Sequence, residues 1–309
     1  MTLPPTVQAA STLDEAWVEV TACPICESLE SRHFESIGMG AERVDYRLCS
    51  NCGAVYQSPR MSDEALEHYY LADYLSQHQR AEGITEKELR VQAGRARHLI
   101  RLLQGRVPTV RRHLDFGSST GKLMQAIGSA YGCVSVGIEP AAVYRGFCAG
   151  LGLRVYPELE AMSEADEQRF DLITLAHVLE HLPDPVGFLR DLRERWLTPE
   201  GTLLVEVPNL FGHFSLERPH LACFHDATLR RVLAAAGFET RRIVQHGSPR
   251  SRLIPLYLTA IAGPVDGRMA ERSRSSARGV RLRRSLGMGW HRLASQLLTR
   301  WAWLPLPEP

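Results

Sequence analysis

The most informative motif of this 309-residue sequence is His113-Leu-Asp115-Phe-Gly117-Ser-Ser-Thr-Gly121-Lys-Leu123. A short strand is expected before and into it, over Val110–Phe116, and a helix after it, over Lys122–Tyr131. A strand, a glycine-rich turn and a helix in this order form a nucleotide-type binding site at the mouth of a parallel sheet.

The spacing of the glycines excludes two common classes of nucleotide-binding loop. A dinucleotide loop counted from Gly117 needs glycine at positions 119 and 122, where Ser119 and Lys122 stand. A P-loop needs one more residue before Gly121 and a hydroxyl at position 123, which is Leu123. The remaining pattern, Asp-x-Gly-x-x-x-Gly, suits a ligand with an ammonium group and a ribose but no phosphate.

The blocks that follow the glycine loop repeat the strand–helix alternation. A buried strand is expected at Cys133–Ile138 and ends in Glu139-Pro140. An apolar strand at 170–176 runs into His177-Val-Leu-Glu-His-Leu-Pro-Asp-Pro185, followed by a helix at 186–196, a turn at 198–201 and a strand at 202–208. Strands that alternate with such helices predict βαβ units and a parallel sheet.

These blocks resemble a known family. Residues 110–246 resemble a class I S-adenosylmethionine-dependent methyltransferase, through DFGSSTG, VGIEP, FDLITLAHVLEHLPDP, GTLLVEVPN and FHDATLRRVLAAAGFETRRI. The resemblance implies a Rossmann-like, doubly wound α/β fold with a mostly parallel seven-stranded sheet. With four cysteines placed before this domain, the chain is similar to the sugar C-methyltransferase group and its relatives. It departs from that group at Ser119, where the family usually has glycine, and in having only an Arg-rich tail after the catalytic core.

The resemblance also implies a cofactor site for S-adenosyl-L-methionine. Asp115 and the loop backbone would hold the methionine part, and Glu139 with Pro140 the ribose. Leu159 and Glu160 would lie near the adenine, and Ala176 and His177 would face the methionine or the substrate. The predicted cofactor residues are Asp115, Gly117, Ser118, Ser119, Gly121, Glu139, Pro140, Leu159, Ala176 and His177. For Glu139 the alternative is an exposed acid at a strand end.

A proton acceptor is expected after the fourth or fifth strand, where several histidines stand. We favour His220 as the catalytic base, because the loop after strand five faces the acceptor in the family, and His177 second. The alternative for each is a polar surface or capping residue. His181 is expected to be structural, and Asn209 to contact substrate or cofactor.

Two cysteine pairs near the N-terminus predict a zinc ribbon. Cys23-Pro-Ile-Cys26 and Cys49-Ser-Asn-Cys52 are two C-x-x-C hooks separated by a segment that is expected to form a hairpin. Four thiolates leave no open coordination position, so the Zn²⁺ would be structural and would supply most of the folding energy of the module. A redox pair or chance pairing is the alternative.

A helical segment joins the ribbon to the glycine loop. Helices are expected after Ser62 and over about 85–103. A cluster with helical spacing, Leu66, Tyr69, Tyr70 and Tyr74, is either core packing or a wall over a ligand pocket. We therefore divide the chain into a zinc-ribbon-like module (1–60), a helical linker or lid (61–108), a methyltransferase domain (109–263) and a tail (264–309).

Charge is unevenly distributed along the chain. Lys+Arg number 36 and Asp+Glu 35, but residues 264–309 hold nine arginines and three acids, a net +6 that leaves −5 for the rest. The tail is expected either to be solvated or to form an interfacial helix, with Leu293, Leu297, Leu298, Trp301 and Leu304 near one face, that contacts a protein partner or an anionic membrane. The N-terminus shows no secretory signal, and seven cysteines without a disulfide framework favour the cytoplasm.

The predicted function is transfer of a methyl group to a carbon or oxygen of a small-molecule acceptor, such as a sugar nucleotide, glycan or secondary metabolite. One alternative is a nucleic-acid or protein methyltransferase that uses the ribbon as a reader. The mixed charge of residues 20–60 and the absence of an Asn/Asp-Pro-Pro-aromatic motif after strand four count against nucleic acid. The other alternative is a non-catalytic module that binds the cofactor.

Overall fold

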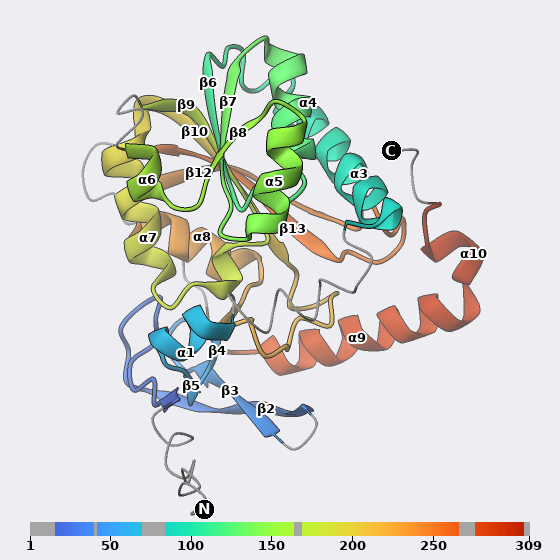
Figure 1. The fold of residues 1–309 in the computed structure, drawn as a ribbon. Helices are drawn as coiled ribbons and strands as arrows, with labels where there is room; N and C mark the ends of the chain where they lie inside the picture. Colours follow the sequence, from blue (N-terminus) through green and yellow to red (C-terminus); the bar gives the residue numbers. More distant parts are fainter. Residues whose placement is uncertain (1–15, 40–41, 70–83, 164–168, 266–275, 306–309) are drawn as a thin grey trace, which may run out of the picture.

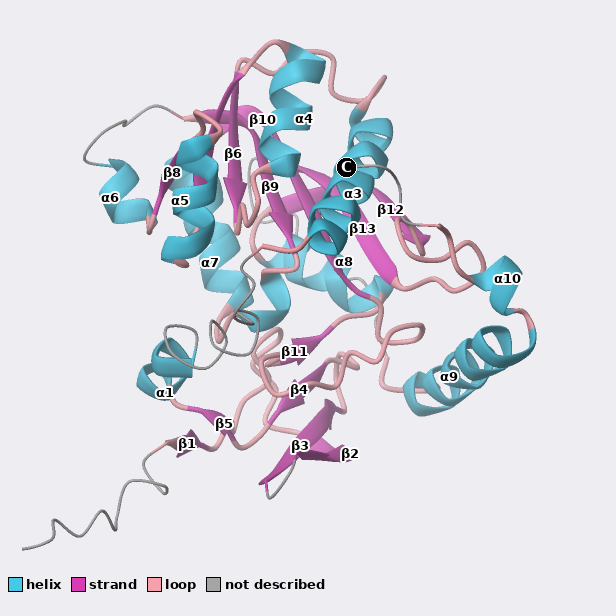
Figure 2. Ribbon diagram, turned by 45° about the vertical axis from the view of Figure 1, so that its right-hand side comes forward, coloured by secondary structure: helices cyan, strands magenta, loops and turns pink. Residues whose placement is uncertain are grey.

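The computed structural model describes residues 16–39, 42–69, 84–163, 169–265 and 276–305. A large sheet covered by helices forms one part of the molecule, and a small sheet that contains the N-terminal strands lies against one end of it (Figure 1). The C-terminal helices run along the side of both parts (Figure 2).

The central sheet has seven strands and confirms the predicted fold class. Its spatial order is β12-β13-β10-β9-β6-β7-β8, and β13 is antiparallel to both of its neighbours, while every other pair is parallel. The strands are β6 (Arg112–Phe116), β7 (Val134–Ile138), β8 (Arg154–Tyr156), β9 (Phe170–Ala176), β10 (Leu197–Pro208), β12 (Phe238–His246) and β13 (Tyr257–Pro264).

Helices cover both faces of this sheet, because its buried strands are apolar on both sides. Ile173 packs into the core with α7 and α8, and its neighbour Leu172 packs into a second core with α3 and α4. The helices are α3 (Glu86–Leu103), α4 (Lys122–Tyr131), α5 (Ala142–Gly150), α6 (Leu159–Ser163), α7 (Pro185–Asp191) and α8 (Asp226–Ala235), with a 3₁₀ turn at η2 (Leu179–His181) and a π-helix at η3 (Leu192–Trp196).

Two predicted segments differ from the structure. The turn expected at 198–201 lies within β10, where the pairing with β9 shifts register between Leu197 and Thr202. The helix expected at 186–196 begins at Pro185 and changes from α to π geometry at Leu192.

The N-terminal strands share a sheet with a segment that follows β10. β2 (Ser31–Met39), β3 (Glu42–Cys49) and β4 (Val55–Gln57) form the expected hairpin and a third strand, and β11 (Ala222–Cys223) pairs with β4. β1 (Trp17–Val18) pairs with β5 (Arg60–Met61). The small sheet is therefore completed by the loop that follows β10.

The two predicted linker helices form, and Ser62 is the predicted cap of the first. α1 (Asp63–His68) begins at Ser62, whose hydroxyl accepts from the backbone N–H of Ala65, and Thr85 caps α3 in the same way. Leu66 and Tyr69 are buried. Tyr70 and Tyr74 lie outside the described residues.

The described part of the tail is helical. α9 (Val280–Leu297) and α10 (Thr299–Ala302) pack through one side against the protein, which contradicts a loosely ordered tail over these residues. On α9 the buried residues are Val280, Arg284, Met288, His291 and Ala294. Within the described residues, no helix is long and apolar enough to cross a membrane.

Candidate functional site

A cavity of about 640 Å³ lies at the carboxyl ends of β6, β7 and β9. Eight of the predicted cofactor residues line it: Asp115, Gly117, Ser118, Ser119, Glu139, Pro140, Ala176 and His177. Helices α1 and α3 add Leu66, Glu88, Gln92 and Arg95 to the wall. Two predicted cofactor residues, Gly121 and Leu159, are not among the lining residues.

The glycine loop has the backbone geometry that its sequence demands. Gly117 has φ +77°, and a Cβ there would come within 2.6 Å of the Val178 side chain. Gly121 begins α4 with φ +68°, where a Cβ would run into Leu153. Ser119 also adopts a positive φ, +46°, which explains why glycine is usual at this position.

Glu139 is held beside this loop by two backbone donors. Its Oε2 accepts from the N–H of Ser119 and its Oε1 from the N–H of Ala141, both at 2.9 Å, and the residue is 9% exposed. Burial raises the pKa of this carboxyl, and the two backbone hydrogen bonds act against that rise. Each oxygen keeps a second lone pair, so the carboxylate fits two further donors from a diol.

Asp115 is buried at the floor of the cavity. The Thr174 hydroxyl donates to its Oδ1 at 2.6 Å, and burial raises its pKa to about 7. The hydroxyls of Ser118 and Thr120 also line the cavity, are buried and have no hydrogen-bond partner among the described residues. Such unpartnered polar atoms fit a polar ligand in this cavity.

His177 stands at the end of β9 in a left-handed conformation, with φ +60°. Its Nδ1 lies 3.3 Å from Glu180 and its Nε2 3.3 Å from Glu206. Burial and Arg95 lower the pKa of His177, but the nearby carboxylates of Glu180 and Glu206 outweigh them, so the pKa is raised.

Arg95 and Glu206 form a buried ion pair that sequence reasoning missed. Arg95 Nε lies 2.7 Å from Oε1 of Glu206, whose side chain is fully buried, and Arg95 Nη2 donates to His177 Nε2 at 3.0 Å. The Thr259 hydroxyl donates to the other oxygen of Glu206. In the sequence, the only sign of this pair is Glu206, an acid inside the apolar run at 202–208. Its partner Arg95 on α3 can be identified only from the fold.

His220, our first choice as the base, does not line the cavity. It is buried, its Nδ1 donates to the carbonyl of Ser215 at 2.8 Å, and its ring lies 4.9 Å from that of His181. His181 does line the cavity. Asn209 is buried and donates to the carbonyl of Pro255, away from the cavity lining.

The four N-terminal cysteines converge. The Sγ atoms of Cys23 and Cys52, and those of Cys26 and Cys49, are 3.6 Å apart, and all four lie within 4.8 Å of one another. A tetrahedral zinc site with bonds of about 2.3 Å needs sulfurs about 3.8 Å apart. The backbone N–H of Cys52 and the side-chain amide of Asn51 donate to sulfurs of the cluster. The residues therefore fit a four-thiolate metal site.

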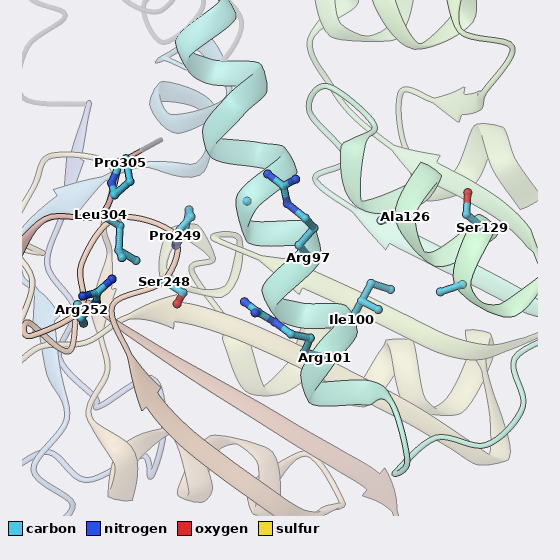
Figure 3. A pocket seen from close by; sticks show the side chains of 12 residues that line it. Arg97, Ile100, Arg101, Ala126, Ser129, Ser248, Pro249, Arg252, Leu304 and Pro305 are labelled. Atoms are coloured by element: carbon cyan, nitrogen blue, oxygen red, sulfur yellow. The ribbon is translucent and has the colours of Figure 1, made fainter. Parts of the chain in front are cut away.

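A second cavity, of about 670 Å³, lies on the other side of α3 (Figure 3). Arg97 and Arg101 from α3 face a wall formed by Ser248, Pro249 and Arg252. No residue predicted to bind cofactor or to act in catalysis lines this cavity. The buried carboxylates and the glycine loop favour the first cavity as the candidate site.

A cavity built on a strand–glycine loop–helix unit, with an acid after the second strand, is the arrangement expected of a methyltransferase. Residues 86–243, about half of the chain, match the model of a family described as "Methyltransferase domain". The chain therefore belongs to the methyltransferase domain family and is a methyl-transferring enzyme, which confirms the resemblance drawn from the sequence.

Solved structures share this fold. A Burkholderia thailandensis 1,6-didemethyltoxoflavin-N1-methyltransferase, solved with 1,6-didemethyltoxoflavin and S-adenosylhomocysteine, is 18% identical with a TM-score of 0.53, over 75% of this chain and 100% of that one. An Archaeoglobus fulgidus SAM-dependent methyltransferase is 20% identical with a TM-score of 0.47, over 65% of this chain and 99% of that one. A search of curated proteins finds no match.

Proposed function

We propose that the cavity at β6, β7 and β9 binds S-adenosyl-L-methionine and that the methyl group passes to a carbon or oxygen of a small-molecule acceptor. The observation that carries this proposal is the pair of buried carboxylates, Asp115 and Glu139, on either side of the glycine loop. When bound, the cofactor supplies an electrophilic methyl group, and the protein supplies position and a dry site.

The carboxylates divide the recognition of the cofactor between them. Asp115, with one oxygen held by Thr174, is placed to bind the ammonium group, and Glu139 to accept from the two ribose hydroxyls. The backbone of Gly117 and Ser119, with little side-chain bulk in the way, permits close approach of the methionine chain. Gly121 shapes the start of α4, and Leu159 on α6 does not line the cavity, so other lining residues would contact the adenine.

The acceptor would lie at the end of the cavity formed by Ala176, His177, Leu182 and Pro183. Of the two histidines predicted to be catalytic, His177 lines the cavity, so we propose that its ring contacts the acceptor. His220 lies behind His181 and acts as a positioning residue.

We also propose that the four-cysteine cluster holds a structural Zn²⁺. The sulfur spacing supports this proposal. Zinc would hold β3 and β4, from which Tyr46 and Gln57 donate to the carbonyls of Glu217 and His220. The ribbon therefore supports the loop beside the acceptor end of the site, and this role needs no nucleic-acid or protein substrate.

A partner is proposed for the outer face of α9. Leu282, Leu286, Leu293 and Leu297, at helical spacing, are 44–75% exposed on the side opposite the packed face. Exposed arginines 281, 283, 292 and 300 flank them, and residues 276–305 contain no acid. This pattern complements an anionic membrane surface, on which such a helix lies in the plane of the headgroups.

Calorimetric titration with S-adenosylmethionine tests the cofactor site. Glu139→Ala is expected to weaken binding at least about 10-fold, because a charge-assisted hydrogen bond contributes roughly 1.5–3 kcal/mol. Glu200→Ala removes an exposed acid of β10 that does not line the cavity and serves as the matched control. Unchanged affinity in the Glu139 variant would remove the ribose assignment. Labelled cofactor and candidate acceptors would then identify the atom that gains the methyl group.

A further inference from the structure

A second group of metal-type ligands lies beside the acceptor end of the cavity. Glu180 and His181 follow β9 in the turn η2, and His220 comes from the loop after β10. One ligand atom of each lies within 4.8 Å of the corresponding atoms of the other two. The three residues are separate from the four-cysteine cluster.

The buried Glu180 carboxylate has an ion-pair neighbour, His177, but no hydrogen-bond donor among the described residues. The residue is 1% exposed, and neither carboxylate oxygen has a hydrogen-bond partner among the described residues. The near approach of His177 Nδ1, at 3.3 Å, does not have the geometry of a hydrogen bond. A buried carboxylate is normally hydrogen-bonded, paired or bound to a metal ion.

The two histidines are oriented by backbone carbonyls. His220 Nδ1 donates to the carbonyl of Ser215 at 2.8 Å, and His181 Nδ1 to that of Pro219 at 2.9 Å. A carbonyl only accepts, so each Nδ1 carries the proton and each Nε2 carries the lone pair. Histidines that bind a metal through one nitrogen almost always donate from the other in this way.

The loop that carries His220 is itself fixed from the ribbon. The Gln57 amide donates to the His220 carbonyl at 2.9 Å, and the Tyr46 hydroxyl lies 3.0 Å from the same oxygen. Both side chains are buried. A ligand that is positioned by such supports loses little entropy when it binds an ion.

We propose that Glu180, His181 and His220 bind a divalent metal ion. The cofactor binding proposed above does not need this ion. Two imidazoles and one carboxylate suit first-row transition ions such as Zn²⁺, Fe²⁺ or Mn²⁺ and leave coordination positions open. Since His181 lines the cavity, an oxygen of the acceptor could occupy one of them. The binding of the ion stands on its own, whereas this contact with the acceptor rests on the proposed function.

Metal content measured by mass spectrometry tests the site. Protein purified, exposed to excess ZnCl₂ and then buffer-exchanged is expected to hold about 2 ions per chain, one of them in the thiolate cluster. His220→Ala and the conservative Glu180→Gln should each hold about one. His68→Ala, an exposed histidine on α1, is the control and should keep both.

Two further measurements keep the outcome decisive. Added ZnCl₂ should raise the Tm of the wild type but not that of Glu180→Gln, and circular dichroism shows whether each variant folds. One ion per chain in the wild type, or two ions in both folded variants, would overturn the proposal. Titration of the same samples with S-adenosylmethionine separates the two proposals. If the protein binds the cofactor but not a second ion, only the metal site is refuted. If it binds the second ion but not the cofactor, only the proposed function is refuted.

Discussion

At the scale of single residues, the charge state of Asp115 should govern the affinity of the proposed cofactor site. Burial, reinforced by the nearby charge of Glu139, raises its pKa to about 7, and the Thr174 hydrogen bond only partly offsets this. Below that pH the carboxyl is neutral and offers no charge to an ammonium group. The affinity for S-adenosylmethionine should therefore rise about 10-fold from pH 6 to pH 8, following the ionised fraction of this group.

Titration calorimetry at several pH values measures this effect. Asp115→Asn should bind more weakly at pH 8 and show little change over the same range. The free energy of unfolding of the ligand-free protein should change in the opposite direction with pH. Because the pKa of Asp115 is higher in the folded than in the unfolded chain, the ligand-free protein becomes less stable as the pH rises from about 4 to 7. Affinity that is independent of pH in the wild type would contradict the assignment.

Ser119 offers a test of backbone strain. Its φ of +46° costs an L-residue roughly 1–2 kcal/mol, which exceeds the entropic cost of glycine in the unfolded chain, about 0.4–1 kcal/mol. Ser119→Gly should therefore stabilise the protein by about 0.5–1 kcal/mol in urea unfolding, since the backbone N–H still donates to Glu139.

The matched control is Ser129→Gly, on the exposed side of α4. There the backbone is helical, so glycine should destabilise by about 0.5 kcal/mol. Equal destabilisation by both substitutions would show that the loop conformation is not strained.

At the scale of elements, the sequence predicted best where a local pattern determines the structure. The helix at Lys122–Tyr131 has the expected bounds, because Gly121 and Gly132 mark its two ends with left-handed backbone. The register shift inside β10 and the pairing of β11 with β4 depend on contacts between distant segments, which no local pattern records.

The same distinction applies to the site. Asp115 and Glu139 could be predicted, because each follows or ends a strand at the edge where parallel strands meet. The ion pair of Arg95 with Glu206 could not, because 111 residues separate the partners and only the packing of α3 against the sheet joins them. His220 was placed in the correct loop, but its burial behind His181 is a property of the folded loop.

The outer face of α9 predicts binding to anionic vesicles. The wild type should sediment with vesicles that contain phosphatidylglycerol and much less with neutral phosphatidylcholine vesicles, which offer no negative charge to the flanking arginines. High salt should also weaken binding, because it screens these arginines. Leu286→Asp places a charge in the apolar stripe and should lower binding about 10-fold or more.

Leu29→Asp is the control for this experiment, because Leu29 is exposed on the ribbon, away from α9. A chain that forms a concentration-dependent dimer through this face and does not sediment with either vesicle would show that the stripe contacts a second copy instead. Analytical ultracentrifugation distinguishes that result.

At the scale of the whole molecule, the ribbon, the tail and the loop after β10 form one packed unit. Phe34 and Val44 of the ribbon share a buried cluster with Leu216 of the loop and Val280 of α9. Arg284 of α9 donates to the Leu210 carbonyl and lies 3.3 Å from the Glu35 carboxylate. Loss of the thiolate cluster should therefore displace the acceptor end of the site. The glycine loop should keep its structure, because it is supported by β6, β7 and α4.

Removal of zinc consequently predicts a split between binding and turnover. Cys26→Ala should lose the metal of the thiolate cluster, lower the Tm and reduce methyl transfer at least about 10-fold, because β4 no longer fixes the loop at Glu217–His220. The Kd for S-adenosylmethionine should stay within about 3-fold, since Asp115 and Glu139 are held by other elements. Cys133→Ala, a cysteine outside the cluster, should change neither quantity. Equal losses of cofactor affinity and turnover in Cys26→Ala would mean that the ribbon supports the whole fold rather than the acceptor loop.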